Sequence, residues 1–183
     1  MKNTKLVAII AIIAAIAIPN LLRSRMAANE SAGIAACKEY GAAQDIYRRT
    51  DWDGDGTLEY SVSLSGANSL YTQNTPGDVA MIEKSFAFAE GDPGTAVPKA
   101  GYVFRVLTGQ GSNAPGGAGT WVVNGSMNLG YALSAVPASY DGTGRNSFQL
   151  NATGTVYQSD RGMAASSSHI VTYDPDSTWT VSE

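Results

Sequence analysis

The first fifty residues carry the clearest pattern of apolar and polar positions. Residues 6–22 read LVAIIAIIAAIAIPNLL, and fifteen of these seventeen residues are apolar. A more polar sequence of helix-forming composition continues to residue 49, and Pro19 is the only proline before that point. The pattern predicts one long helix over residues 1–49, about 70 Å in length at 1.5 Å per residue. Proline removes a backbone donor, so we expect the helix to kink near Pro19.

The two halves of this predicted helix need different partners to cover their apolar side chains. In the second half, Ile34, Lys38, Ala42 and Ile46 recur at intervals of four, which predicts a mildly apolar face turned towards the rest of the chain. A helix of this length cannot bury its whole surface against a body of about 130 residues. Residues 1–26 should therefore project and find apolar partners elsewhere.

Three interpretations of the apolar stretch are open. A cleavable signal peptide would use Lys2 and Lys5 as its basic start and residues 15–17 as a small-residue cleavage site. A membrane span of seventeen residues would reach about 25 Å, against a hydrocarbon core of about 30 Å. A membrane-held assembly helix would stay in the bilayer only until the subunit is extracted. The helical composition after residue 22 favours the third interpretation, because signal peptides usually give way to non-helical sequence.

The periodicity changes after residue 49. Alternating or apolar runs predict strands at residues 58–64, 102–108, 121–124, 129–136 and 147–150, with weaker signals at 155–158 and 169–173. Apolar residues at helical spacing predict a short helix near residues 78–90. We therefore expect a globular domain over residues 50–183, in which an antiparallel sheet packs on the long helix. This is an α+β fold.

Composition and charge sharpen this division. The chain has a net charge of -4, but residues 1–49 carry seven basic and three acidic side chains, and the remainder carries five basic and thirteen acidic. The acidic balance argues against nucleic-acid binding, which needs clustered cations. A single cysteine excludes an internal disulfide and a cysteine-based zinc site. Because aliphatic residues are scarce after residue 22, we expect Trp121 and Trp179 to fill the core.

No catalytic constellation stands out. The run Ser166–His169 places hydroxyl groups beside an imidazole, but adjacent residues rarely have triad geometry, and no nucleophile elbow is present. Asp174–Asp176 is typical of a turn. We expect Cys37, which lies among alanines, to be a small buried hydrophobe. The prediction is that the protein is not an enzyme.

The sharpest local motif follows the predicted helix and reads DWDGDGTLE over residues 51–59. Calcium needs several hard oxygen ligands, and carboxylates at alternate positions can wrap around one ion. The candidate calcium ligands are Asp51, Asp53, Asp55, Thr57 and Glu59. The bidentate glutamate that closes an EF-hand loop is missing, because Val62 stands at that position. The alternative is an Asp/Gly turn that joins helix to strand, and both interpretations remain open.

The N-terminal residues carry a family resemblance. The segment AIIAIIAAIAIPNLLRSRMAANESA, residues 8–32, resembles the N-terminal helix of bacterial type IV pilins and of the pseudopilins of type II secretion. The second half of the chain is similar to a pilin-associated exported domain family of unknown function, through segments such as GYVF at residues 101–104 and YDPDSTW at residues 173–179. One departure concerns the start of the chain. Such pilins have a cleaved glycine and a glutamate at the fifth mature position, and Lys2 occupies the place of that glutamate. Whether a prepilin peptidase cleaves this chain is therefore an open question.

The resemblance implies a structural subunit of an extracellular type IV pilus-like filament. Its expected partners are the inner membrane before assembly, the assembly machinery, and copies of itself in a helical homopolymer at the cell surface. Pseudopilins use calcium structurally, so the acidic loop favours a type II secretion pseudopilin as the alternative. A soluble exported binding module behind a signal peptide is the second alternative. The expected assembly residues are Leu6, Val7, Ile9, Ile10, Ile12, Ile13, Ile16, Ile18, Pro19, Leu21 and Leu22.

Overall fold

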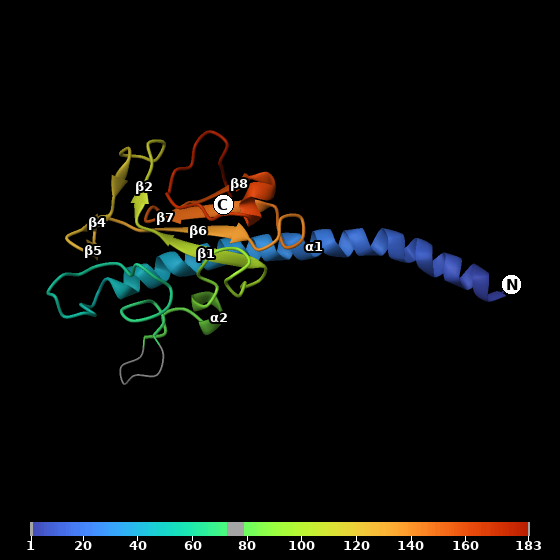
Figure 1. Cartoon of the computed structure of the whole chain (residues 1–183), viewed down its shortest axis with the longest axis horizontal. Helices are drawn as coiled ribbons and strands as arrows, with labels where there is room; N and C mark the ends of the chain where they lie inside the picture. Colours follow the sequence, from blue (N-terminus) through green and yellow to red (C-terminus); the bar gives the residue numbers. More distant parts are fainter. Residues whose placement is uncertain (1, 73–78, 183) are drawn as a thin grey trace.

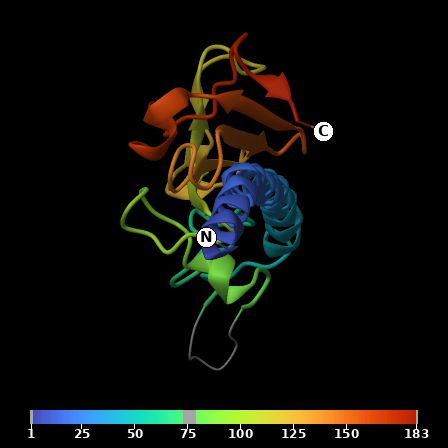
Figure 2. The same ribbon diagram turned by 90° about the vertical axis from the view of Figure 1, so that its right-hand side faces the viewer.

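The computed structural model describes residues 2–72 and 79–182. One long helix, α1, runs along one side of a body that contains a five-stranded antiparallel sheet, and its N-terminal half projects from the body (Figure 1). Viewed along α1 from its N-terminus, the sheet lies on one side of the helix and the loops that carry the short helix α2 lie on another (Figure 2). The α+β class is confirmed.

Helix α1 spans Lys2–Tyr47, which agrees closely with the predicted range. It is rich in alanine and contains no glycine before Gly33, so the backbone pays little entropy to become helical. The helix runs through Pro19 without interruption and curves gently in its N-terminal half (Figure 1). In place of the expected kink at Pro19, the helix therefore shows only this gentle curvature.

The face by which α1 contacts the body differs from the predicted stripe. Lys38, Ala42 and Ile46 are exposed, and Ile46 keeps 51% of its surface. The buried face consists of small residues and tyrosines that recur at intervals of three and four: Gly33, Ala36, Cys37, Tyr40, Gly41, Ala43, Gln44 and Tyr47. A Cβ added at Gly33 would lie 3.3 Å from the Phe148 ring, so the helix approaches the sheet closely there. Ile34 of the predicted stripe does pack against the core, but the prediction was wrong for the other three positions, because the contact face is built from small residues and tyrosines.

The main sheet has the order β1-β6-β7-β8-β9, and every neighbouring pair is antiparallel. Its strands are β1 (Tyr102–Leu107), β6 (Ala132–Pro137), β7 (Asn146–Asn151), β8 (Val156–Asp160) and β9 (Thr180–Val181). Two small hairpins lie outside it and pair β2 (Gly109–Gln110) with β3 (Gly119–Thr120), and β4 (Val122–Val123) with β5 (Ser126–Met127). Helix α1 contacts β6, β7 and β8.

Aromatic residues dominate the core between α1 and the sheet, as the scarcity of aliphatic residues predicted. Tyr102 and Phe148 are fully buried with ring centroids 5.5 Å apart, and Phe86 meets Phe104 edge-on at 4.7 Å. Such pairs add a favourable electrostatic contact to the area that they bury. Trp121 is buried as predicted, whereas Trp179 is only half-buried and lies outside the core.

Three predicted elements are shorter than expected or absent from the described residues. The helix predicted near residues 78–90 is reduced to α2 at Lys84–Ala87, and the predicted range begins among residues that are not described. Residues 58–64 form no strand beyond a single bridge from Tyr60 to Met127. Residues 169–173 form only a bridge from Tyr173 to Gln110. For the two predicted strands the local pattern is present, but no neighbouring strand pairs with either segment along its length.

The face of the sheet opposite α1 is covered by the segment that follows β8. This segment contains the 3-10 helix η1 (Gly162–Ser166) and continues to Tyr173. Polar side chains of the sheet bond to it: Ser134 Oγ donates to the Ile170 carbonyl at 3.2 Å, and Gln149 Oε1 accepts from the Asp174 N–H at 3.0 Å. Both sheet residues are fully buried. The two sheet faces therefore differ, with an aromatic core on one side and a polar layer on the other.

Candidate functional site

The first candidate site is the projecting half of α1. Every large apolar residue between Leu6 and Leu22 is exposed, with exposed fractions between 47% and 64%. These are the expected assembly residues Leu6, Val7, Ile9, Ile10, Ile12, Ile13, Ile16, Ile18, Leu21 and Leu22, and Pro19 is exposed with them. A surface this apolar costs free energy in water unless something covers it. The body of the same chain does not cover this surface.

The apolar surface of this half-helix surrounds the helix completely. Positions such as 9, 10, 12 and 13 point to different sides at 100° per residue, so no polar face remains. The segment is long and apolar enough to cross a membrane by length and composition, and none of it is buried. A helix that is apolar on all sides is stable either in lipid or in the middle of a bundle. Lipid and a bundle of apolar helices are therefore the two environments that would cover this segment.

Three polar contacts fix the direction in which the apolar half projects. The Asn29 side-chain amide donates to the Thr143 carbonyl at 2.9 Å. The Glu30 carboxylate accepts from the Arg145 backbone N–H at 2.8 Å and from the Asn146 N–H at 3.2 Å. These are the first residues of α1 that bond to the loop before β7. They clamp the helix at the edge of the body and leave the preceding residues free.

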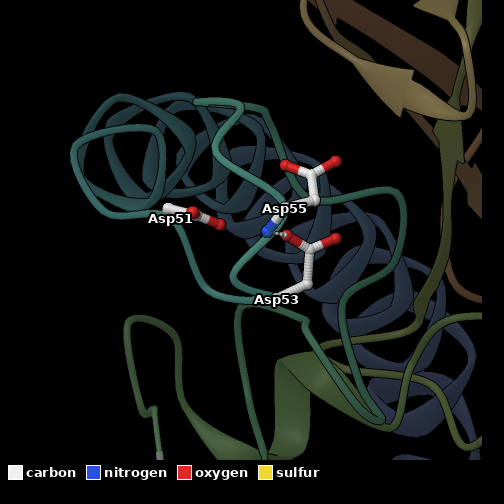
Figure 3. Close-up of side chains that lie close together, drawn as sticks. All are labelled: Asp51, Asp53 and Asp55. Carbon is white, nitrogen blue, oxygen red and sulfur yellow. Dashed lines mark hydrogen bonds between the residues drawn. The ribbon is translucent and has the colours of Figure 1, made fainter.

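The second candidate site is the acidic loop, residues 51–59, at the opposite end of α1. The structure brings Asp51, Asp53 and Asp55 together, with one carboxylate oxygen of each within 4.8 Å of the others (Figure 3). Gly54 and Gly56 have φ values of 77° and 85° and let the backbone turn tightly around these side chains. The three aspartates point into one region from a loop of five residues.

Each of the three carboxylates accepts at least one hydrogen bond from a backbone N–H group. Asp51 accepts from Gly54 at 2.8 Å and from Gly56 at 2.9 Å, and Asp55 accepts from Thr57 at 2.7 Å. The Gly56 N–H in particular lowers the pKa of Asp51. Partial burial raises the pKa of Glu59, and the neighbouring aspartates raise it further. The loop is thus a turn rich in aspartate and glycine that holds three carboxyl groups close together.

The donor set fits calcium in part. Three carboxylates offer hard oxygens at the spacing of a wrapped loop, which is the chemistry that calcium prefers. Glu59 does not join the three clustered carboxylates, and the Thr57 N–H bonds to Asp55. Asp51, Asp53 and Asp55 would hold the ion, while the predicted roles of Thr57 and Glu59 stay predictions.

His169, which the sequence places beside three serines, contacts a different serine in the structure. His169 is buried, and its Nδ1 lies 3.4 Å from Ser134 Oγ in β6, not beside the serines that precede it. Burial lowers the pKa of His169 to about 4, and the positive charges of Arg105 and Arg161 act in the same direction. The imidazole is therefore neutral and enclosed between the sheet and the covering segment.

Sequence reasoning missed a cavity of about 600 Å³ beside the C-terminal end of α1. Its walls come from Tyr47, Trp52 and the loops around Tyr71 and Phe88. Tyr71 and Phe88 are far in sequence from Tyr47 and Trp52, so only the fold brings the four rings together. The one available signal was the surplus of aromatic residues around positions 47–88.

Comparison with known proteins adds one match. Residues 14–181 match the model of a protein family described as "Protein of unknown function (DUF2950)". The match begins inside the projecting half of α1 and includes the acidic loop and all strands of the sheet. No curated protein and no solved structure matches the chain.

Proposed function

We propose that this chain, which belongs to the DUF2950 family of proteins of unknown function, is the structural subunit of an extracellular filament of the type IV pilin kind. In this proposal the subunit is held in the inner membrane by residues 6–22. It is then packed with copies of itself, so that the apolar half-helices form the filament core and the bodies form its surface. Its partners are the membrane, the assembly machinery and other copies of the chain.

One observation carries the proposal: ten large apolar side chains lie exposed on a continuous helix whose other half is the core of the body. Each side chain of this size contributes about 1.5–3 kcal/mol when it is fully buried. A single copy gains none of this free energy, and a bundle of copies gains most of it. The projecting half continues without a break into the part of α1 that packs on the body, which suits the segment to a repeating assembly.

The residues between the large side chains support close packing. Ala8, Ala11, Ala14, Ala15 and Ala17 alternate with the isoleucines. Small residues let helix backbones approach closely in an apolar environment, where packing and not the hydrophobic effect holds helices together. The same segment can therefore leave lipid for a helical bundle at little cost.

The decisive experiment is negative-stain microscopy of the purified protein after removal of detergent, combined with the intact mass of the same sample. We expect filaments built from a subunit that retains residues 6–22. Monodisperse particles whose mass shows cleavage at or after residue 17 would refute the proposal and support the exported binding module.

A second candidate function rests on the clustered carboxylates of the acidic loop. A pseudopilin of type II secretion would use the same assembly helix and a structural calcium ion at Asp51, Asp53 and Asp55. Filament length separates the two candidates, because a pseudopilus is a short periplasmic piston. Long surface filaments support the pilus, and short assemblies that require calcium support the pseudopilin.

A further inference from the structure

The cavity beside the C-terminal end of α1 has the size of a small-molecule site. Its volume of about 600 Å³ lies within the range of about 300–1,000 Å³ that is typical of ligand pockets. It lies at the opposite end of α1 from the projecting half, so it is separate from the proposed assembly surface. Its described lining residues are Tyr47, Trp52, Ser65, Gly66, Ala67, Asn68, Ser69, Tyr71, Thr72, Val79 and Phe88.

Two aromatic pairs form the apolar walls. Tyr47 and Trp52 are stacked, with ring centroids 5.6 Å apart and an interplanar angle of 29°. Tyr71 and Phe88 meet edge-on at 6.4 Å, and the Lys84 ammonium lies 5.7 Å from the centroid of Phe88. Trp52 and Tyr71 are both half-buried, so each ring is held by the protein and still has surface to offer.

Hydrogen bonds fix these walls in place. The Trp52 indole N–H donates to the Tyr47 carbonyl at 2.9 Å, and the Tyr47 hydroxyl donates to the Asn68 carbonyl at 2.8 Å. The loop from Gly66 to Tyr71 is held by a hydrogen bond between its ends, because the Gly66 N–H donates to the Tyr71 carbonyl at 3.3 Å. The cavity is therefore a preformed site, and a ligand would lose little affinity to ordering of these walls.

The remaining lining residues that the structure describes are uncharged and mostly polar. Ser65, Asn68, Ser69 and Thr72 contribute hydroxyl and amide groups, and no described lining residue is acidic or basic. A phosphate or carboxylate ligand would need a cation, and a cationic ligand would need a carboxylate. The Ser69 and Thr72 hydroxyls already bond within the protein. A lipid chain would nevertheless offer no partner to the Ser65 hydroxyl or the Asn68 amide. The lining thus suits a ligand that is neutral, has a flat apolar face and has polar edges.

We propose that this cavity binds a neutral saccharide. One face of a pyranose ring presents C–H groups with a slight positive charge, and the electron-rich face of an aromatic ring attracts them. The hydroxyl groups around the edge of the sugar can exchange hydrogen bonds with serine, threonine and asparagine side chains. In this site the sugar rests against Trp52 and Tyr71, and its hydroxyls face Asn68 and Ser65.

Saturation-transfer NMR on the full chain tests the proposal. The protein is kept in lauryldimethylamine oxide, a detergent without sugar, so that the detergent does not compete. The probes are maltose, cellobiose, lactose and N,N′-diacetylchitobiose, with glucuronic acid as a charged comparison and N-acetylphenylalanine amide as a peptide-like comparison. We expect transfer to at least one neutral disaccharide and little to the two comparison compounds.

Three variants locate the signal. Trp52→Ala removes a wall, and Ala67→Trp fills the cavity from its exposed rim without removing any packing. We expect each to raise the Kd of the bound disaccharide at least tenfold. Trp179→Ala is the matched control, because it deletes a half-buried indole that does not line the cavity. It should leave the Kd within twofold of the original, and unchanged circular dichroism shows that each variant is folded.

The outcomes are distinct. Transfer to none of the four disaccharides overturns the proposal, as does binding that Ala67→Trp leaves unchanged in a folded protein. Transfer to N-acetylphenylalanine amide alone overturns the proposal and indicates that the cavity binds a peptide side chain. Equal transfer to glucuronic acid and to the disaccharides overturns the claim that the cavity prefers neutral sugars. Filament formation enters none of these results, so they stand independently of the assembly proposal.

Discussion

The two halves of α1 show that burial follows the available partner and not the hydrophobicity of the segment. Residues 6–22 contain six of the ten isoleucines of the chain, yet their large side chains are all exposed. Residues 33–47 are built from small residues and tyrosines, yet Cys37, Tyr40 and Tyr47 are almost completely buried. The more apolar half is the one without a partner in its own chain. This exposed apolar half is the feature on which the assembly proposal rests.

The largest expected effect comes from a charge in the apolar half. In the proposed filament, Ile13→Asp would bury a carboxylate among apolar helices, and the desolvation penalty of several kcal/mol recurs in every subunit. We expect filaments to be lost in negative-stain images while the circular dichroism of the body is unchanged.

The control for this change is Ile46→Asp, at an isoleucine of similar exposure in the second half of the same helix, 51% against 60%. It should leave the filaments intact. If Ile13→Asp assembles as well as the original protein, the two halves do not differ in the way proposed here.

The next effect is on the stability of the body. Phe148 is fully buried against Tyr102 and the Gly33 turn of α1, so Phe148→Ala should lower the free energy of unfolding by about 3–5 kcal/mol. Ile10→Ala removes an exposed side chain, and its effect on unfolding of the unassembled subunit should be close to zero. Urea unfolding followed by tryptophan fluorescence measures both. Equal losses would mean that the apolar half is already packed in the isolated subunit.

A smaller effect concerns pH, and it is confined to the body. Burial lowers the pKa of His169 from 6.5 to about 4, so the unfolded chain binds more protons than the folded chain between these values. Stability should therefore fall as the pH drops through this window, by about 2–3 kcal/mol. The groups that face the imidazole are Arg105, Arg161 and Asp92.

The variant His169→Gln isolates this contribution, because His169 is the only histidine in the chain. The difference in unfolding free energy between the two proteins should change with pH in the direction given. A difference that stays constant from pH 7 to pH 4 would show that the imidazole is exposed to solvent in the folded state.

The smallest effect is expected at the acidic loop. If calcium binds at Asp51, Asp53 and Asp55, a tenfold excess over its Kd stabilises the folded state by about 1.4 kcal/mol, and the midpoint of thermal unfolding rises. Asp53→Asn with Asp55→Asn should abolish the rise. Magnesium, which demands octahedral geometry and keeps its waters, should have little effect. A midpoint that calcium does not move would leave the loop as an Asp/Gly turn.

Much of the fold could be predicted because its signals are local. The apolar run of residues 6–22 and the alternating strands β1, β6 and β7 carry their pattern within a few residues of sequence. The buried face of α1 could not be predicted in this way, since tyrosines such as Tyr40 are apolar or polar according to what they contact. Tyr40 is buried because its hydroxyl reaches the Ala132 carbonyl at 3.3 Å and accepts from Gln44 at 2.7 Å.

The acidic loop and the aromatic cavity differ in the same way. Asp51, Asp53 and Asp55 lie within five residues, so their clustering follows from sequence alone. The aromatic cavity joins Tyr47 to Phe88 across a loop, and no local pattern reveals it. Glu59 is not one of the three clustered carboxylates, and its role as a ligand stays a prediction.

Hydrogen–deuterium exchange of the detergent-free protein tests the central claim most directly. Peptides from residues 6–22 are compared with peptides from residues 33–47, since packed segments exchange slowly and unpacked helices exchange fast. The account predicts that both halves of α1 are protected to a similar degree once the subunits have assembled. Exchange of residues 6–22 within seconds, while residues 33–47 stay protected, would contradict it, because the apolar half would then have no partner at all.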